Sequence, residues 1–439
     1  MSTIVAPSTP SGRGAIAIVR LSGSLALQIA KNLAPELDNV KPRRASLVNI
    51  RFPETGGILD EVLVTYFPRP HSVTGEDVVE ISCHGSPGVV RQILDLAIHF
   101  GARLAEPGEF TLRAVSNKKI NLAEAEAIRD LIAARTQAAV KQASRQIGGE
   151  LSKALQGFED QLVKVIVQLE SVLEFVEDDL PPTELREVQE TLAAAQTGIS
   201  ELAESYSAGR LLQEGLKVPI IGSPNVGKSS LFNRLVEHDR AIVTEIPGTT
   251  RDTLSQAIDI GGIPVLLVDT AGLRETADSI ESLGIERTRR AIDDADLILE
   301  VVDASAFDEQ RVEPETEIPS ILVFNKCDLP STRNDAQAIR VSALTGEGLD
   351  SLRAAILELF NRADRSQEGL MITNARQYEL LKRAADEIDS ALALIQQRVS
   401  EEMILVPLHN SLMCLGQITG ETTTEDILTQ VFSTFCIGK

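Results

Sequence analysis

The sequence predicts a protein of the α/β plus all-α class, in which an α/β segment interrupts a helical domain. Three observations support this prediction. Short β-branched runs alternate with Gly and Pro early in the chain, three later stretches carry apolar residues at helical spacing, and a segment of apolar strands with polar loops separates the last two stretches. A length of 439 residues exceeds what one hydrophobic core usually serves, so several domains are expected.

A small α/β domain is predicted at the N-terminus. The runs AIAIV at residues 15–19 and VLVTY at residues 62–66 have the β-branched composition of strands. From Leu122 onward the pattern changes to that of helices. We therefore expect the first domain to cover residues 1–119.

Three apolar stripes predict a helical domain in two parts. The stripes cover residues 151–176, 185–206 and 381–399, and Pro181 with Pro182 ends the first helix. Because each stripe is short, packing within a bundle is favoured over a free intermolecular coiled coil. Pro407 predicts a kink or a late start in the helix before the last one. The expected boundaries are 120–212 for the first helical part, 213–369 for the inserted segment and 370–439 for the second helical part.

Composition narrows the functional class. A formal net charge of -22 argues against nucleic-acid binding by the overall field, so such binding would need a local patch or a partner. The four cysteines form no CxxC pair, which indicates neither a disulfide framework nor a zinc site. The N-terminus lacks the signal-peptide pattern and no apolar run is long enough to span a bilayer. We expect a cytoplasmic protein with no membrane partner.

A phosphate-binding loop is predicted at residues 222–229. The sequence GSPNVGKS matches the P-loop pattern between a predicted strand at 218–221 and a predicted helix at 230–236. In such a loop the backbone N–H groups surround the phosphates, Lys228 reaches the β and γ oxygens, and Ser229 offers its hydroxyl to magnesium. Pro219 removes a hydrogen-bond donor from a strand expected to be central, and the sequence does not explain it.

Three further elements complete a predicted guanine-nucleotide site. The DTAG run begins at Asp269, which can hold magnesium through water, and Thr250 in the GTTRD run is expected to close over the metal. Asp328 of the NKCD run can accept both N–H groups of the guanine edge, which adenine does not offer. The predicted GTP contacts are Asn225, Val226, Gly227, Lys228, Ser229, Ser230, Thr249, Thr250, Asp269, Gly272, Asn325, Lys326, Asp328, Ser342 and Ala343, with Ser229 and Thr250 as magnesium ligands.

The catalytic residue is less clear from the motifs. Leu273 follows DTAG where Ras-like proteins carry a glutamine that orients water, and leucine cannot polarise water. Arg274, Glu275 and Glu281 are nearby candidates, although position alone favours solvated surface charges. Asn225 is a turn residue or the ligand of a monovalent cation.

Outside the nucleotide motifs, the chain resembles the MnmE (TrmE) family of tRNA modification GTPases over its whole length. The runs that carry this resemblance are TIVA at 3–6, GRG at 12–14, RLSG at 20–23, TGEDVVE at 74–80, HG at 84–85, AEPGEFT at 105–111, RA at 113–114, NLAEAEA at 121–127 and FCIGK at 435–439.

The resemblance implies a homodimer formed by the N-terminal domain, which binds a 5-formyl- or methylene-tetrahydrofolate, and a Ras-like G domain inserted in the helical domain. By motif, the implied folate contacts are Arg20, Glu80, Lys119 and Lys439. The implied potassium ligands are Asn225, Thr244, Ile246 and Thr249. Glu281 becomes the implied catalytic residue, acting on water through a second water, while Arg274 remains a candidate from its position alone.

The resemblance also implies partners. The family works with a flavin-dependent protein, MnmG (GidA), in a heterotetrameric complex that modifies carbon 5 of the wobble uridine of certain tRNAs. Cys436 is equally consistent with a reactive thiol and with a small buried residue.

Two other functions are weighed against this one. An Era-type GTPase that regulates ribosome assembly shares the nucleotide motifs, but the N-terminal marks and the CIGK ending argue against it. An adenine-nucleotide motor is opposed by Asp328.

Overall fold

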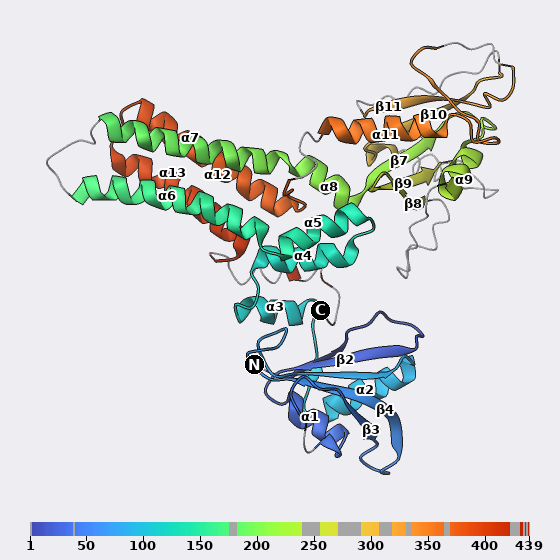
Figure 1. Cartoon of the computed structure of the whole chain (residues 1–439), viewed down its shortest axis with the longest axis vertical. Coiled ribbons are helices and arrows are strands. Elements are labelled where there is room, and N and C mark those ends of the chain that lie inside the picture. Colours follow the sequence, from blue (N-terminus) through green and yellow to red (C-terminus); the bar gives the residue numbers. More distant parts are fainter. Residues whose placement is uncertain are drawn as a thin grey trace, which may run out of the picture. The chain divides into compact units, whose positions relative to one another are not determined.

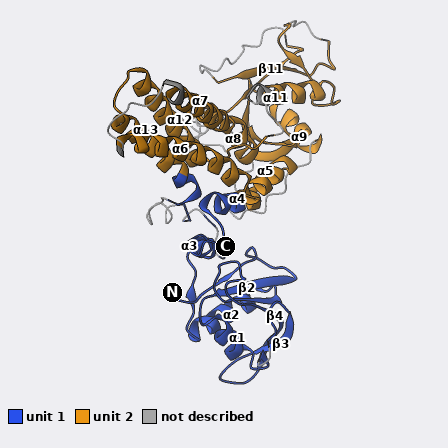
Figure 2. Ribbon diagram, turned by 60° about the vertical axis from the view of Figure 1, so that its left-hand side comes forward, with its two compact units in different colours: residues 1–129, 416–439 blue, residues 130–415 orange. Residues whose placement is uncertain are grey.

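The computed structural model describes residues 2–37, 40–174, 182–238, 255–270, 291–306, 318–330, 335–363, 369–421, 431–432, 435 and 438. The α/β plus all-α class is confirmed, because two six-stranded sheets and a set of long helices are present (Figure 1). The chain divides into two compact units, residues 1–129 with 416–439 and residues 130–415 (Figure 2). Within the described residues, no helix has the length and apolar character needed to cross a bilayer.

The first unit is built on a sheet with the strand order β3-β4-β5-β2-β1-β6. All neighbouring strands are antiparallel except the pair β1 and β6. The elements are β1 Ile4–Pro7, β2 Ile16–Ser22, α1 Ala26–Leu33, β3 Ser46–Arg51, β4 Ile58–Phe67, β5 Val78–His84, α2 Pro87–His99, β6 Arg103–Leu104 and α3 Glu109–Ser116.

The two faces of this sheet differ. Side chains such as Leu21 and Ile81 are buried in the core, against α1 and α2. Because side chains alternate along a strand, the neighbouring residues lie on the other face. That face carries Ile16, Leu47 and Leu63, which are 66%, 63% and 44% exposed. One face is therefore the core; the other, the open face, is exposed on β2, β3 and β4 but covered at β1, where Ile4 and Ala6 pack with Phe110 of α3.

A buried ion network holds α3 against the sheet. Arg113 is 4% exposed and donates to Glu76 at 2.8 Å, to Glu109 at 2.8 Å and to the carbonyl of Ser2 at 2.8 Å. Burial alone would raise the pKa of Glu109, but hydrogen bonds from Arg103, the backbone of Glu106 and Arg113 outweigh it and lower the pKa to about 2. Glu76, Glu109 and Arg113, which belong to the runs that carry the family resemblance, therefore hold α3 against the sheet.

Loss of the Glu109 carboxylate is expected to destabilise this unit in a pH-dependent way. A depressed folded-state pKa stabilises the fold above the unfolded value of 4.5, and this stabilisation fades as the pH falls towards about 2. Glu109→Gln should therefore cost on the order of 3 kcal/mol at pH 7 and less than half of that at pH 3. Urea unfolding measures this, followed by the fluorescence of Tyr66 in a Tyr206→Phe and Tyr378→Phe background. A pH-independent difference would contradict the ion-network account.

The second sheet has the order β12-β11-β10-β7-β9-β8, and only β8 runs antiparallel to its neighbour. Its buried side chains form one core with residues of α8 and with Met371, so the segments that enter and leave the sheet belong to its core. The elements are α8 Tyr206–Glu214, β7 Leu216–Ile221, α9 Lys228–His238, β8 Ser255–Ile260, β9 Ile263–Asp269, β10 Ile298–Asp303, β11 Ser320–Asn325, β12 Ile339–Arg340 and α11 Leu349–Ala363.

The sheet accounts for Pro219. The N–H of Lys217 donates to the Asp296 carboxylate, and the carbonyl of Lys217 accepts from the N–H of Asp296. Backbone groups two residues apart in a strand point the same way, so the nitrogen of Pro219, which has no hydrogen to donate, faces β10 as Lys217 does. The ladder between β7 and β10 begins only at Ile220, so Pro219 interrupts no rung of it.

The helical stripes are buried between neighbouring helices. Helix α7 packs against both α6 and α12 (Figure 1). The buried stripe residues include Leu155, Leu162, Leu192, Ile199 and Ile388. The helices are α4 Leu122–Ala133, α5 Gln137–Ile147, α6 Glu150–Glu174, α7 Pro182–Glu204, α12 Ala375–Gln396 and α13 Glu401–Thr419.

Some predicted helix ends are wrong. The second helix was expected to include Tyr206, but α7 ends at Glu204, and the Ser205 hydroxyl donates to the carbonyl of Leu202, which competes with helical bonding. The third ends at Gln396, before the left-handed Arg398, rather than at Val399. Helix α13 begins at Glu401 and continues through Pro407, so a late start is not observed.

Candidate functional site

The predicted phosphate loop lies at the carboxyl end of the central strand β7 and leads into α9. Gly222 and Gly227 have φ values of +149° and +93°. A Cβ on Gly222 would overlap the carbonyl oxygen of Val301, so the loop requires glycine there. Asn225 has φ 66°, an unusual conformation for a residue with a side chain. The Lys228 ammonium donates to the carbonyls of Gly222 and Ser223 at 3.0 and 2.7 Å, across the loop.

Asn325 connects the phosphate loop with the two loops predicted to recognise the base. It lies at the end of β11 and is 1% exposed. Its Nδ2 donates to the carbonyl of Val226 at 2.8 Å, and its Oδ1 accepts from the N–H of Ala343 at 3.0 Å. A Cβ on Gly227 would overlap Asn325 Nδ2. One buried amide therefore fixes three loops, although Val226 and Asn325 are 99 residues apart in sequence.

Lys326 is held in a left-handed conformation, φ 63°, by two contacts. Its Nζ lies 2.6 Å from Asp303 Oδ2 and donates to the carbonyl of Asn225 at 2.9 Å. Burial would raise the pKa of Asp303, but hydrogen bonds from Lys326 and Ser305 outweigh it and lower that pKa. Asp303 was not predicted from the sequence, although an acidic residue at the carboxyl end of a buried strand is a signal that could have been followed.

The Asp328 carboxylate is oriented by Ser342. The hydroxyl of Ser342, a fully buried residue, donates to Asp328 Oδ1 at 2.6 Å. Asp328 itself is exposed. A carboxylate oxygen has two lone pairs, so this arrangement leaves acceptor capacity on the exposed side.

Asp269 ends β9, next to the strand that carries the phosphate loop. It is 6% exposed, and the hydroxyl of the adjoining Thr270 donates to the carbonyl of Ile220 at 2.6 Å. This side-chain bond ties the beginning of the DTAG run to β7. Ser229 and Ser230 lie in the first turn of α9.

Part of the predicted nucleotide site lies outside the described residues. This part comprises Thr244, Ile246, Thr249, Thr250, Gly272, Arg274 and Glu281, which include the predicted potassium loop and catalytic residues. Cys436 and Lys439 at the C-terminus also lie outside the described residues.

In the first unit, Arg20 and Glu80 form a pair on the open face of the sheet. They are register partners on β2 and β5, with Arg20 Nε 3.0 Å from Glu80 Oε1. The guanidinium lies 5.7 Å from the centre of the Phe110 ring. Lys119 contacts the turn before β5, because its Cγ lies 3.2 Å from the position of a Cβ on Gly75.

The C-terminal tail lies against the same sheet. The Ser8 hydroxyl donates to the carbonyl of Gly438 at 3.1 Å, and a Cβ on Gly438, φ +92°, would overlap the carbonyl oxygen of Pro7. Pro7 ends β1, the neighbour of β2. Phe432 and Phe435 pack on Gly108 just before α3. The tail therefore reaches the sheet that carries Arg20, although more than four hundred residues separate them in sequence.

Comparison with known proteins gives matches along the whole chain. The family model described as the MnmE helical domain matches residues 122–436, and the model described as the GTP-binding protein TrmE N-terminus matches residues 3–119. The tRNA modification GTPase MnmE of Koribacter versatilis is 45% identical, over 100% of this chain and 99% of that protein. The protein of the same name from Aquifex aeolicus is 42% identical, over 99% of each. Among solved structures, the G domain of the T. maritima FeoB iron transporter is 28% identical, with a TM-score of 0.24, and the match covers 33% of this chain and 98% of that one.

Proposed function

Because this chain belongs to the MnmE family of tRNA modification GTPases, it is a GTP hydrolase that acts in tRNA modification, and we propose how its residues divide that work. The second unit hydrolyses GTP in a potassium-dependent reaction. The first unit binds a tetrahydrofolate that supplies a one-carbon unit. With a flavin-dependent partner, MnmG (GidA), the protein modifies carbon 5 of the wobble uridine of certain tRNAs.

The observation that carries the GTP part is the Asn325 contact. It brings the phosphate loop, the NKCD run and Ala343 to one edge of the sheet, where the carboxyl ends of parallel strands meet. We propose that Gly227, Lys228 and Ser230 bind the phosphates and that Asp328, with Lys326 and Ala343, binds guanine. The remaining proposed contacts are Asn225, Val226, Ser229, Thr249, Thr250, Asp269, Gly272, Asn325 and Ser342.

We propose that two cations assist hydrolysis. Ser229 and Thr250 would hold magnesium, for which hydroxyl oxygens are suitable ligands. Potassium would take oxygen atoms from Asn225, Thr244, Ile246 and Thr249, and would supply positive charge near the γ-phosphate. The left-handed backbone of Asn225 supports this role, because strain of this kind is common at ligand-binding loops.

Potassium should stimulate GTP hydrolysis. Leu273 cannot orient water, so we assign that task to Glu281, with Arg274 as a second candidate in the same segment. Asn225→Ala is expected to lose the difference between potassium and sodium. Glu281→Ala should keep nucleotide binding and slow turnover about 10²-fold or more. Phosphate release in matched potassium and sodium buffers measures both. Equal rates in the two salts for the unmodified protein would contradict the potassium role.

We propose that Arg20, Glu80, Lys119 and Lys439 bind the folate. Folates carry a carboxylate tail, with which cationic side chains can pair. They also carry a pterin edge whose N–H groups can donate hydrogen bonds to Glu80. The support from the first unit is the Arg20–Glu80 pair beside Phe110, together with the seat of Gly438 on β1. Cys436, two residues before Gly438, would then lie near the one-carbon group.

The partners follow from the remaining surfaces and charge. The exposed side chains Ile16, Leu47 and Leu63 on the open sheet face support a homodimer through the first unit. A net charge of -22 disfavours contact with the tRNA phosphates, so MnmG would make most of the contacts with tRNA. The two proteins would form a heterotetrameric complex in the cytoplasm. The match over the N-terminal and helical parts does not favour an Era-type regulator. Loss of the modified wobble uridine from tRNA of a strain that lacks this chain separates the two functions.

A further inference from the structure

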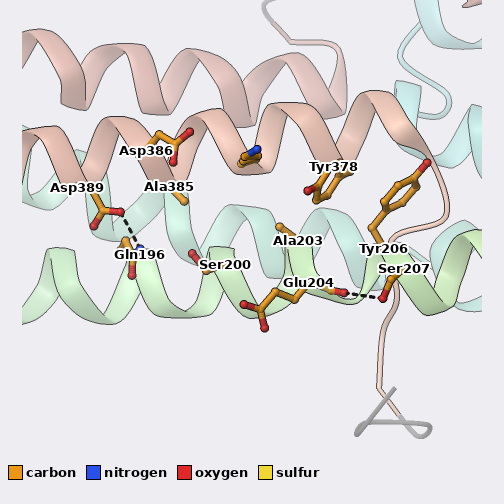
Figure 3. Close-up of a pocket in the computed structure, with 11 residues that line it drawn as sticks. Gln196, Ser200, Ala203, Glu204, Tyr206, Ser207, Tyr378, Ala385, Asp386 and Asp389 are labelled. Carbon is orange, nitrogen blue, oxygen red and sulfur yellow. Dashed lines mark hydrogen bonds between the residues drawn. The ribbon is translucent and has the colours of Figure 1, made fainter. Parts of the chain in front are cut away.

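A cavity of about 280 Å³ lies between the helices α7, α8 and α12 of the second unit (Figure 3). Its floor includes the buried Ala203 and Ala385. The other lining residues are Gln196, Ser200, Glu204, Tyr206, Ser207, Tyr378, Lys382, Asp386 and Asp389. None of these residues has a role in the proposed nucleotide or folate sites.

Two tyrosines form one end of this cavity. Tyr206 and Tyr378 stack with ring centres 4.7 Å apart and planes at 16°. Tyr206 is the first residue of α8, and Tyr378 lies in the first turn of α12, so the stack sits where the chain enters and leaves the sheet segment. Burial, followed by the charge of Glu214, raises the pKa of Tyr206. Aromatic faces of this kind attract cations.

Three carboxylates line the cavity, those of Glu204, Asp386 and Asp389. None of them forms an ion pair with another residue in the described part of the chain, and Asp389 accepts a hydrogen bond from Gln196 at 3.1 Å. The only cationic residue among the lining residues is Lys382, which leaves an excess of negative charge.

The carboxylates are spread along the groove rather than gathered at one point. Asp386 and Asp389 are three residues apart on α12, about 4.5 Å along its axis. Gln196, which contacts Asp389, lies eight residues before Glu204 on α7, so the backbone positions of Gln196 and Glu204 are about 12 Å apart along that helix. Figure 3 shows Asp389 beside Gln196 at one end of the cavity, and Glu204 between Ser200 and Tyr206.

We propose that this cavity binds a linear aliphatic polyamine. A volume of about 280 Å³ lies at the lower end of the range for ligand pockets, so it suits a slender molecule better than a nucleotide. Alkyl segments would lie on Ala203 and Ala385, while ammonium groups would pair with Asp386, Asp389 and Glu204. Acidic residues spread along about 12 Å of helix match ammonium groups spaced along a chain better than the single guanidinium group of an arginine side chain.

Tyrosine fluorescence tests this proposal directly. The chain has three tyrosines and no tryptophan, and two of the three tyrosines line the cavity. In the full chain carrying Tyr66→Phe, titration with spermidine should give a saturable change in emission. Calorimetry on the unmodified chain gives a second measurement that does not depend on that substitution.

The variants separate specific binding from attraction to an acidic protein. Asp386→Asn with Asp389→Asn should weaken spermidine binding at least about tenfold, whereas Lys382→Met should tighten it by about threefold. Glu187→Gln with Glu190→Gln makes the same charge change on an exposed part of α7 and should leave the affinity within about twofold. Equal loss in the two double variants, or stronger binding of arginine amide than of spermidine, would overturn the proposal. GTP turnover of the variants is a separate readout, so failure here leaves the GTPase assignment intact.

Discussion

Replacing Asp328 by asparagine is expected to weaken GTP use by about 10²-fold or more and to make xanthosine triphosphate the better substrate. A carboxylate accepts two N–H groups of guanine, whereas an amide offers one acceptor and one donor group. Xanthine carries a carbonyl where guanine carries its amino group, so the side-chain amide of the variant can donate to it. The hydroxyl of Ser342 can still donate to the side-chain oxygen at this position, which keeps the side chain in its present orientation.

The measurement is kcat/KM for GTP, xanthosine triphosphate and ATP with saturating magnesium and potassium. Ser342→Ala is the matched control, because it removes the orienting hydrogen bond of 2.6 Å and leaves the carboxylate. We expect this control to weaken GTP use about tenfold at most, without a change of preferred base. If the unmodified protein used GTP and ATP equally well, the assignment of Asp328 to base recognition would be wrong.

Removal of residues 437–439 is expected to abolish uridine modification and to weaken folate binding, while GTP hydrolysis stays within about twofold. The physical reason is that the tail reaches the sheet of the first unit at Pro7 and Ser8, whereas the proposed nucleotide contacts belong to the second unit. Lys439 follows Gly438 directly and would add its charge to that of Lys119 around the anionic part of the folate, whereas Arg20 is paired with Glu80.

Two single variants divide this effect into its parts. Gly438→Ala puts a Cβ against the carbonyl oxygen of Pro7 in a left-handed conformation, so it should displace the tail. Lys439→Gln should leave the contacts of Gly438 with Pro7 and Ser8 intact and remove only the positive charge. Calorimetry with 5-formyltetrahydrofolate measures all three proteins. An unchanged affinity in the truncated protein would mean that the tail serves packing or partner contact only.

Much of the fold follows from local patterns in the sequence. Parallel strands that are buried on both faces read as short continuous apolar runs, so β7 could be predicted from residues 218–221, and the stripes of α6 and α7 could be predicted from apolar residues at the helical period of 3.6. The phosphate loop and the NKCD run could be predicted for a related reason. Their glycines, Lys228 and Asp328 act through short segments whose chemistry is local.

Helix ends were less predictable, because they depend on a few side-chain and backbone bonds. Tyr206 fits the apolar stripe of α7, yet the hydroxyl of Ser205 bonds to the carbonyl of Leu202 and a new helix begins at Tyr206. That break allows Tyr206 to stack on Tyr378, a contact with α12 that no local pattern in α7 indicates.

The sequence by itself determined the fold class, the nucleotide motifs and the family to which the chain belongs. Only the tertiary structure decided that Asp303 holds Lys326, that Asn325 joins the phosphate loop to Ala343, that Arg113 is buried between Glu76 and Glu109, and that Gly438 lies on Pro7. Each of these contacts joins residues that are far apart along the chain or brings a charge into a buried place. Their formation depends on the packing of whole elements, which outweighs local preference and leaves no periodic signal in the sequence.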